Sequence, residues 1–145
     1  MRCLLIIFSL AIFTGCATSP ALTTSDTMQI IQAAADSAPA GVYGKYTLLI
    51  QSTGTQIGDD RIFLNTELDY RDQRNITIAL SHDAVKELND HTGQAAIELF
   101  KGKQIQVIGD ANRVRIDFTS RGQPTGKYYY QTHIRVTQAS QIKVL

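Results

Sequence analysis

The stretch GKQIQVIGDANRVRIDF, residues 102–118, is the clearest indication of how the chain folds. Apolar and polar residues alternate on either side of a turn-like Gly-Asp-Ala-Asn at 109–112, with Ile105 and Val107 before it and Val114, Ile116 and Phe118 after it. Alternation of this kind is typical of half-buried β-strands, and Gly, Asp and Asn favour turns. We therefore predict a long hairpin, with Arg113, Arg115 and Asp117 on the face opposite the core.

The same period of two predicts further strands on both sides of this hairpin. Three strands are expected before it, at residues 43–51, 61–65 and 76–80, joined by a turn at 54–58 and a polar connection at 69–75. A last strand is expected at 128–136, with a short continuation at 142–144. The first three strands are predicted to form a meander.

Helical patterns appear in two places. Asp26 is a suitable N-cap for a short helix that ends before Pro39. Between the third and fourth strands, residues 83–92 and 94–100 favour one helix or two short ones, with Asp83 as the expected cap. The whole chain is thus predicted to be all-β with one helical insert.

The order of three strands, one helical segment and two strands resembles that of OB-fold domains. The segments that carry the resemblance are 102–109 followed by 113–116, and the closing residues 132–145. It implies a five-stranded barrel over 42–145 whose ligands bind on the face of the second and third strands. An antiparallel β-sandwich, or an α+β sheet with the helix on one face, is the alternative architecture.

The N-terminus has the pattern of a secreted, lipid-anchored protein. Arg2 precedes an apolar run too short to span a bilayer, and the run ends in Phe13-Thr14-Gly15-Cys16. This tetrapeptide resembles the lipobox of bacterial lipoproteins, which implies cleavage before Cys16 and acylation of its thiol. Residues 1–15 are therefore expected to be a signal peptide, and 16–41 a lipidated tether with a short helix. Ala17 resembles the residue that directs lipoproteins to the outer membrane, facing the periplasm, and the inner membrane is the alternative.

Charge is balanced overall but uneven along the chain. Residues 17–100 carry five Lys and Arg against eleven Asp and Glu, whereas residues 101–145 carry eight against two. The formal net charge of the full chain is +1, which argues against a generic polyanion binder.

The candidate ligand-binding residues combine the face implied by the OB resemblance with the densest polar clusters. They are Phe63, Asn65, Asp69, Tyr70, Arg71, Asp72, Arg74, Arg113 and Arg115. The Asp69–Asn75 segment could hold a cation or a phosphate, or it could be a salt-bridged surface turn. Residues 63–66 with 69–72 also resemble uncharacterised bacterial envelope proteins, a likeness that implies no activity.

No sequence motif indicates a reaction. The Walker, Gly-x-Ser-x-Gly, dinucleotide-binding and EF-hand patterns are absent from the sequence. His82, Asp83 and His91 lack the spacing of helical metal ligands, so neither a metal nor a cofactor is predicted. We expect a membrane-anchored, non-catalytic binding or assembly module whose partner is an envelope protein or glycan rather than a nucleic acid. The alternatives are a single-stranded nucleic acid or oligonucleotide-binding OB domain, with Tyr128–Tyr130 beside Arg113 and Arg115, and a metal-dependent hydrolase on the same scaffold.

Overall fold

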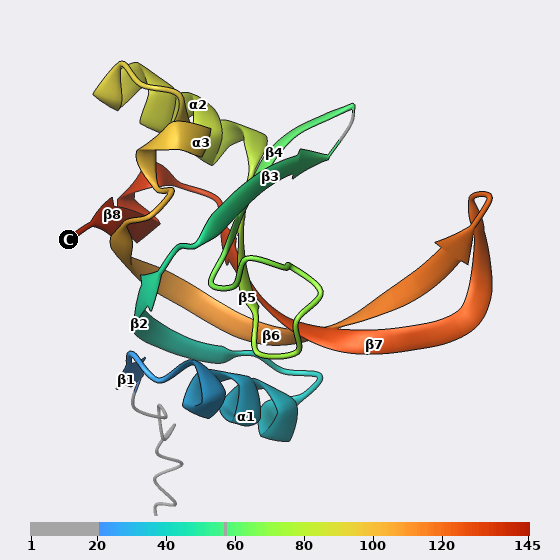
Figure 1. Ribbon diagram of the computed structural model, residues 1–145. Helices are drawn as coiled ribbons and strands as arrows, with labels where there is room; N and C mark the ends of the chain where they lie inside the picture. The colour runs from blue at the N-terminus through green and yellow to red at the C-terminus, as the bar shows by residue number, and fades with distance from the viewer. Residues whose placement is uncertain (1–20, 57) are drawn as a thin grey trace, which may run out of the picture.

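The computed structural model describes residues 21–56 and 58–145, which form one mixed β-sheet with helices packed against it (Figure 1). The elements in chain order are β1 (Leu22–Thr24), α1 (Thr27–Ser37), β2 (Val42–Leu49), β3 (Ser52–Gln56), β4 (Asp59–Asn65), β5 (Ile76–Leu80), α2 (His82–Thr92), α3 (Ala96–Leu99), β6 (Gln104–Ser120), β7 (Gln123–Val136), the 3-10 helix η1 (Ala139–Gln141) and β8 (Ile142–Val144). The chain was predicted to be all-β with one helical insert; it is mostly β, with the insert formed by α2 and α3 and a further helix, α1, before β2.

The sheet runs in the order β1-β2-β6-β7-β5-β4-β3, with β8 beside β6. Strands β5 and β7 are parallel, as are β1 and β2, and the other neighbours are antiparallel. Because all described strands belong to one sheet, the sandwich alternative is excluded. The hydrogen-bonded path is open, although β2 and β3 near its two ends are separated in the chain by only Ile50 and Gln51.

The core lies on one face of this curved sheet. Its largest fully buried side chains come from the strands, the link between β2 and β3, α1 and the end of the helical insert, and they are Tyr46, Phe100, Ile30, Leu48, Ile50, Leu64, Ile76, Ile78, Leu80, Ile105, Ile134 and Val107. The predicted alternation in β2, β5 and the second half of β7 is therefore correct. Burial of these apolar side chains supplies the main driving force for folding.

Both predicted helices are present, with one change of cap. The carboxylate of Asp26 accepts hydrogen bonds from the backbone N–H of Met28 (2.9 Å) and Gln29 (3.2 Å), as predicted. The N-cap of α2 is Ser81, whose hydroxyl accepts from the Ala84 N–H at 3.3 Å, and Asp83 lies inside the first turn. At that position Asp83 can still interact favourably with the helix dipole.

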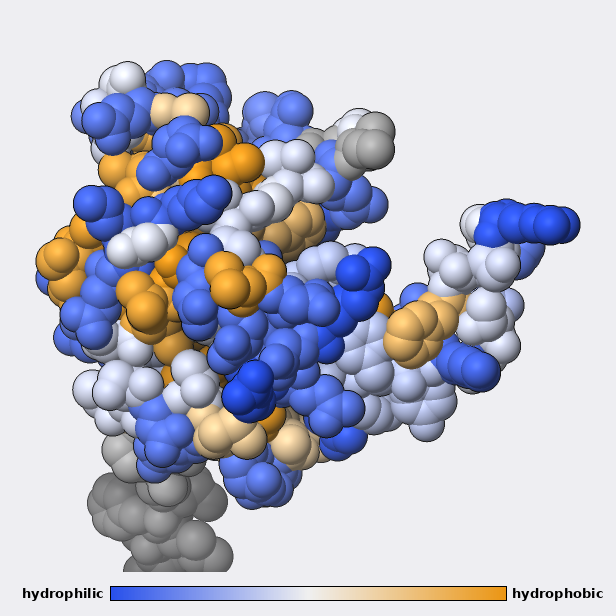
Figure 2. Space-filling view, in the orientation of Figure 1, coloured by the Kyte–Doolittle hydropathy of each residue, from blue (hydrophilic) through white to orange (hydrophobic). Residues whose placement is uncertain are grey.

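The largest difference from the sequence prediction concerns residues 102–118. They form no hairpin at 109–112, because β6 runs unbroken for 17 residues and turns only at Arg121 and Gly122. The apolar residues change from odd to even positions at Ala111 because the strand leaves the core there. Beyond this point β6 and the first half of β7 project from the body as a two-stranded arm (Figures 1 and 2). We call residues 113–131 the arm.

Two smaller boundaries also differ from the prediction. Gly54 lies within β3, paired with Phe63, so the turn is shorter than 54–58. Leu22–Thr24, which lies in the predicted tether, forms a strand that pairs in parallel with residues 44–46 of β2. A three-residue strand has too little alternation to be recognised from sequence.

Candidate ligand-binding groove

The face of the sheet opposite the core, which we call the outer face, contains a groove of about 960 Å³. The groove lies between the β3–β4 hairpin and the root of the arm. Six of the side chains that line it carry its chemistry: Tyr43, Arg61, Phe63, Ala79, His133 and Arg135. They face outward because their neighbours in the strands, such as Ile62, Leu64 and Ile134, fill the core.

Strand register places three of these residues in one row across the sheet. Phe63 pairs with Ala79, and Ala79 pairs with Arg135. The small side chain of Ala79 therefore separates an aromatic ring from a guanidinium group. A planar group that lies on this floor can stack on the ring and place its negative charge beside the guanidinium.

The charged groups of the groove are two arginines and one carboxylate. Arg61 donates a hydrogen bond to Gln56 Oε1 at 3.5 Å, and its guanidinium lies 5.8 Å from the centroid of the Phe63 ring. No ion pair engages Arg135 within the part of the chain that the structure describes. Asp110 lies among the lining residues next to Tyr43. The balance of charge in the groove is positive.

His133 contributes a neutral ring rather than a third positive charge. Burial lowers its pKa, and the nearby charge of Arg135 lowers it further. The Nε2 atom of His133 lies 2.9 Å from Gln131 Oε1 in a hydrogen bond. At neutral pH the ring can therefore exchange hydrogen bonds with a ligand without adding charge.

The predicted Asp69–Asn75 cluster is bound mainly to itself. Asp69 accepts from the N–H of Arg71 at 2.9 Å, and Asp72 accepts from the N–H of Arg74 at 2.8 Å. The Arg74 guanidinium contacts both carboxylate oxygens of Asp72 at 3.1 and 2.8 Å, and these hydrogen bonds lower the pKa of Asp72 to about 2. This arrangement fits the interpretation as a salt-bridged turn better than that of a cation site.

Asn75 anchors this turn to the body of the protein. Its side chain is 1% exposed and contacts Asn65, Thr66 and Thr77, as well as the carbonyl oxygen of Tyr70. Asn65 is thus a buried structural residue rather than part of the groove, whereas Phe63 does line the groove.

The remaining predicted site residues form stacked pairs outside the groove. The guanidinium of Arg71 lies 4.4 Å from the Tyr70 ring centroid, and those of Arg113 and Arg115 lie 3.7 and 4.1 Å from the centroids of Tyr130 and Tyr128. The last two pairs lie on one face of the arm. Tyr129 lies on the other face, with its ring centroid 5.2 Å from that of Phe118. Neither face is core, because Tyr128 and Tyr130 on the first face are 49% and 42% exposed, and Phe118 on the second is 46% exposed.

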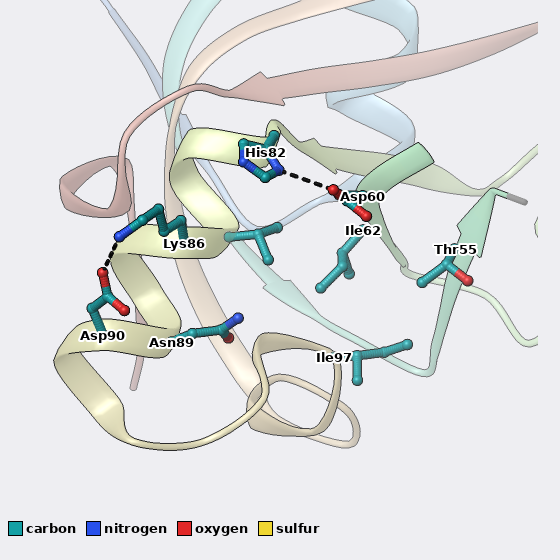
Figure 3. A pocket seen from close by; sticks show the side chains of 9 residues that line it. Thr55, Asp60, Ile62, His82, Lys86, Asn89, Asp90 and Ile97 are labelled. Carbon is teal, nitrogen blue, oxygen red and sulfur yellow. Dashed lines mark hydrogen bonds and ion pairs between the residues drawn. The ribbon is translucent and has the colours of Figure 1, made fainter. Parts of the chain in front are cut away.

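A second hollow lies between α2, α3 and β4, and Figure 3 shows the side chains around it. His82 Nδ1 points to Asp60 Oδ2 at 3.3 Å, and Lys86 Nζ lies 2.6 Å from Asp90 Oδ2. Among the described residues, no group of three or more His, Cys, Asp or Glu is placed to hold a metal ion. His82 pairs with a strand carboxylate, which no sequence spacing indicates.

The predicted lipidation site, Cys16, and the signal peptide lie outside the described residues. Within residues 21–56 and 58–145, no helix has both the length and the apolar character needed to cross a bilayer.

Comparison with known proteins gives a likeness of fold only. No protein-family model matches the chain, and no curated protein matches it. An aspartyl tRNA synthetase from Entamoeba histolytica is similar with a TM-score of 0.50 and 13% identity, over 95% of this chain and 24% of that one. A putative aspartyl-tRNA synthetase from Leishmania major Friedlin gives a TM-score of 0.47 and 16% identity, over 92% of this chain and 22% of that one. The chain thus spans about a quarter of the first protein's length, and that likeness supports OB-fold-like β structure.

Proposed function

We propose that this chain is a non-catalytic OB-type module that binds a single-stranded oligonucleotide in the groove on its outer face. The row of Phe63, Ala79 and Arg135 carries the proposal, since it offers a stacking surface next to a guanidinium that no ion pair engages among the described residues. Proteins that bind single strands combine such aromatic platforms with a basic groove. The polar side chains along the groove, including Gln56 and Asn112, can donate hydrogen bonds to bases or sugars.

The proposed binding site also depends on how the sheet closes. We infer that β2 and β3 act as one bent strand, which would close the sheet into the five-stranded barrel expected from sequence. The Ile50 N–H donates to Lys103 O, beside β6, and the Gln51 N–H donates to Asn65 O on β4, each at 2.9 Å. The corner between β2 and β3 is therefore hydrogen-bonded both to the residue before β6 and to β4, which would link the two ends of the strand order. In such a barrel the groove lies where OB folds take oligonucleotides or oligosaccharides.

The similar solved structure adds modest support. The Entamoeba histolytica protein is named as a tRNA synthetase, so it acts on a nucleic acid. At 13% identity this likeness supports a common architecture.

Binding is tested with a fluorescent single-stranded oligodeoxynucleotide and matched variants. Phe63→Ala is expected to weaken binding about tenfold, since stacking on an aromatic contributes about 1–3 kcal/mol per base. Arg135→Ala is expected to weaken binding and to reduce the slope of log affinity against log salt by about 1. Fluorescence anisotropy at several salt concentrations measures both effects.

The control for Arg135→Ala is Lys143→Ala, which removes the same charge from an exposed position in β8, outside the groove. Its affinity should stay close to that of the parent. Equal losses in both variants would indicate non-specific attraction, and no binding by the parent protein would reject the proposal.

We further propose that acylation of Cys16 holds this module at the periplasmic face of the outer membrane, where an envelope protein or glycan could also use the groove. The lipobox-like Phe13–Cys16 favours this anchor. Cells grown with radiolabelled palmitate are expected to label the parent chain, and Cys16→Ser should lose all label and leave the membrane fraction. Cys3→Ser is the matched control, because Cys3 lies inside the predicted signal peptide. Label that persists in Cys16→Ser would contradict the anchor.

A further inference from the structure

The arm presents an unpaired strand edge. Strand β2 covers one edge of β6 only as far as the pair of Val42 with Ala111, and β7 covers the other edge along the arm. Among the described strands, none pairs with the outer edge of residues 113–119. Such an edge offers a row of free N–H and C=O groups to another strand.

The side chains of this edge are apolar on one face although they lie outside the core. Val114 and Ile116 are half-buried, and Phe118 is 46% exposed. The opposite face carries Arg113 and Arg115 on their tyrosine rings. An isolated two-stranded hairpin is only marginally stable in water, so further strands would stabilise the arm.

The sequence of the edge is complementary to itself in the antiparallel direction. When residues 113–119 are placed against a second copy with Ile116 at the centre, Ile116 meets Ile116, and Val114 meets Phe118. In the same register Arg115 meets Asp117 twice, once in each direction. Opposite charges and apolar pairs at facing positions both stabilise neighbouring strands.

We propose that a second copy of this chain pairs with β6 through residues 113–119, which gives a two-fold symmetric dimer with a four-stranded arm. The interface is isologous, as is usual for closed dimers. Within one chain, Arg115 donates to Asp117 Oδ1 from Nε at 2.9 Å and from Nη2 at 2.7 Å. Both hydrogen bonds use the same carboxylate oxygen, and no hydrogen bond among the described residues engages Asp117 Oδ2, which can therefore accept from the guanidinium of the second copy. This inference does not depend on the oligonucleotide groove.

Charge reversal separates this dimer from other forms of association. Arg115→Asp places Asp opposite Asp117 of the second copy, and Asp117→Arg places Arg opposite Arg115. Each variant alone is expected to weaken dimerisation at least tenfold, because like charges at facing positions repel. A mixture of the two variants restores both opposite-charge pairs between chains, so a mixed dimer is expected to form.

Sedimentation of the full chain in a density-matched neutral detergent measures whether each protein is a monomer or a dimer. The expected pattern is a dimer for the parent, monomers for each variant alone, and a dimer for the mixture. Repair within one chain cannot explain recovery in the mixture, since each variant chain keeps its two like charges. A parent that stays monomeric at about 100 µM, a tight dimer in either variant alone, or a mixture that stays monomeric would overturn the proposal.

A disulfide test remains informative if a charge variant fails to fold. Facing residues of antiparallel strands have Cα atoms about 4.5–5.5 Å apart, within the range of disulfides. Ile116→Cys is therefore expected to form a covalent dimer on mild oxidation much faster than Thr125→Cys, an exposed position on β7. Equal rates for the two variants, or faster cross-linking at Thr125, would contradict pairing through β6.

Discussion

Replacing Asn75 with alanine is expected to lower the free energy of unfolding by about 4 kcal/mol, since a buried polar group that loses its partner costs about 1–3 kcal/mol. The Asn75 amide nitrogen lies 3.2 Å from Asn65 Oδ1 and 3.0 Å from Thr77 Oγ1, and its oxygen accepts from the Glu67 N–H at 3.2 Å. Alanine leaves these groups without that partner and also creates a cavity. Urea unfolding of parent and variant measures the difference.

Asn75→Asp keeps the shape of the side chain and tests the role of the amide donors. The new carboxylate would face Asn65 Oδ1, Thr77 Oγ1 and the carbonyl oxygen of Tyr70, all of which accept hydrogen bonds from the present amide. At neutral pH this variant should be at least as unstable as Asn75→Ala, because a buried charge without a positive partner is costly. Its instability should lessen as the pH falls, since the protonated acid can donate one hydrogen bond.

Gln73→Ala is the matched control for both variants, because Gln73 is an exposed residue of the same loop. It should change the free energy of unfolding by less than about 0.5 kcal/mol. Similar losses at positions 73 and 75 would show that the whole loop, rather than the buried amide, determines stability.

The sequence predicted correctly those strands whose apolar residues all lie on the face that packs against the core. Residues 76–80 alternate and are short, and they form β5 as expected. The hairpin predicted for residues 102–118 is wrong, because two different physical causes give the change of phase seen at Ala111. A turn can shift the alternation by one residue, and the same shift appears when a continuous strand leaves the core and its apolar side chains occupy the other face. Only the pairing of β6 with β7 as far as Gln123 distinguishes the two.

The candidate site was harder to predict than the fold, because its residues come from strands far apart in the sequence and are brought together only by the pairing of those strands. Phe63 was predicted, but Arg135 was not, although it alternates with the core residues Ile134 and Val136. Its importance follows from the parallel pairing of β5 with β7, which brings it beside Ala79. The density of charge in the Asp69–Asn75 segment indicated a possible site, yet these charged groups mainly form hydrogen bonds within the turn.

Gly44→Ala is expected to lower the free energy of unfolding by about 3 kcal/mol, at the upper end of the cost of overpacking a core. A methyl group at Gly44 would collide with the ring of Tyr46 and with the carbonyl oxygen of Leu22. Tyr46 cannot move aside easily, because it is fully buried and its hydroxyl donates to the Val42 carbonyl oxygen at 2.6 Å. Relief must therefore come from β1, which pairs with β2 at this point. We expect Leu22–Thr24 to detach, which hydrogen exchange at these residues would detect.

Gly54→Ala is the matched control, since Gly54 also lies in a strand and an added methyl group there meets nothing within 4 Å. That change should be neutral, or slightly stabilising because alanine restricts the unfolded chain. A double-mutant cycle then assigns the loss at Gly44 to its cause. If the collision with the ring is responsible, Gly44→Ala should cost at least 1 kcal/mol less in a Tyr46→Ala background than in the parent. An unchanged loss of stability would instead show that the collision with the Leu22 carbonyl oxygen is responsible. Glycine would then be required at position 44 because β1 packs against β2 there.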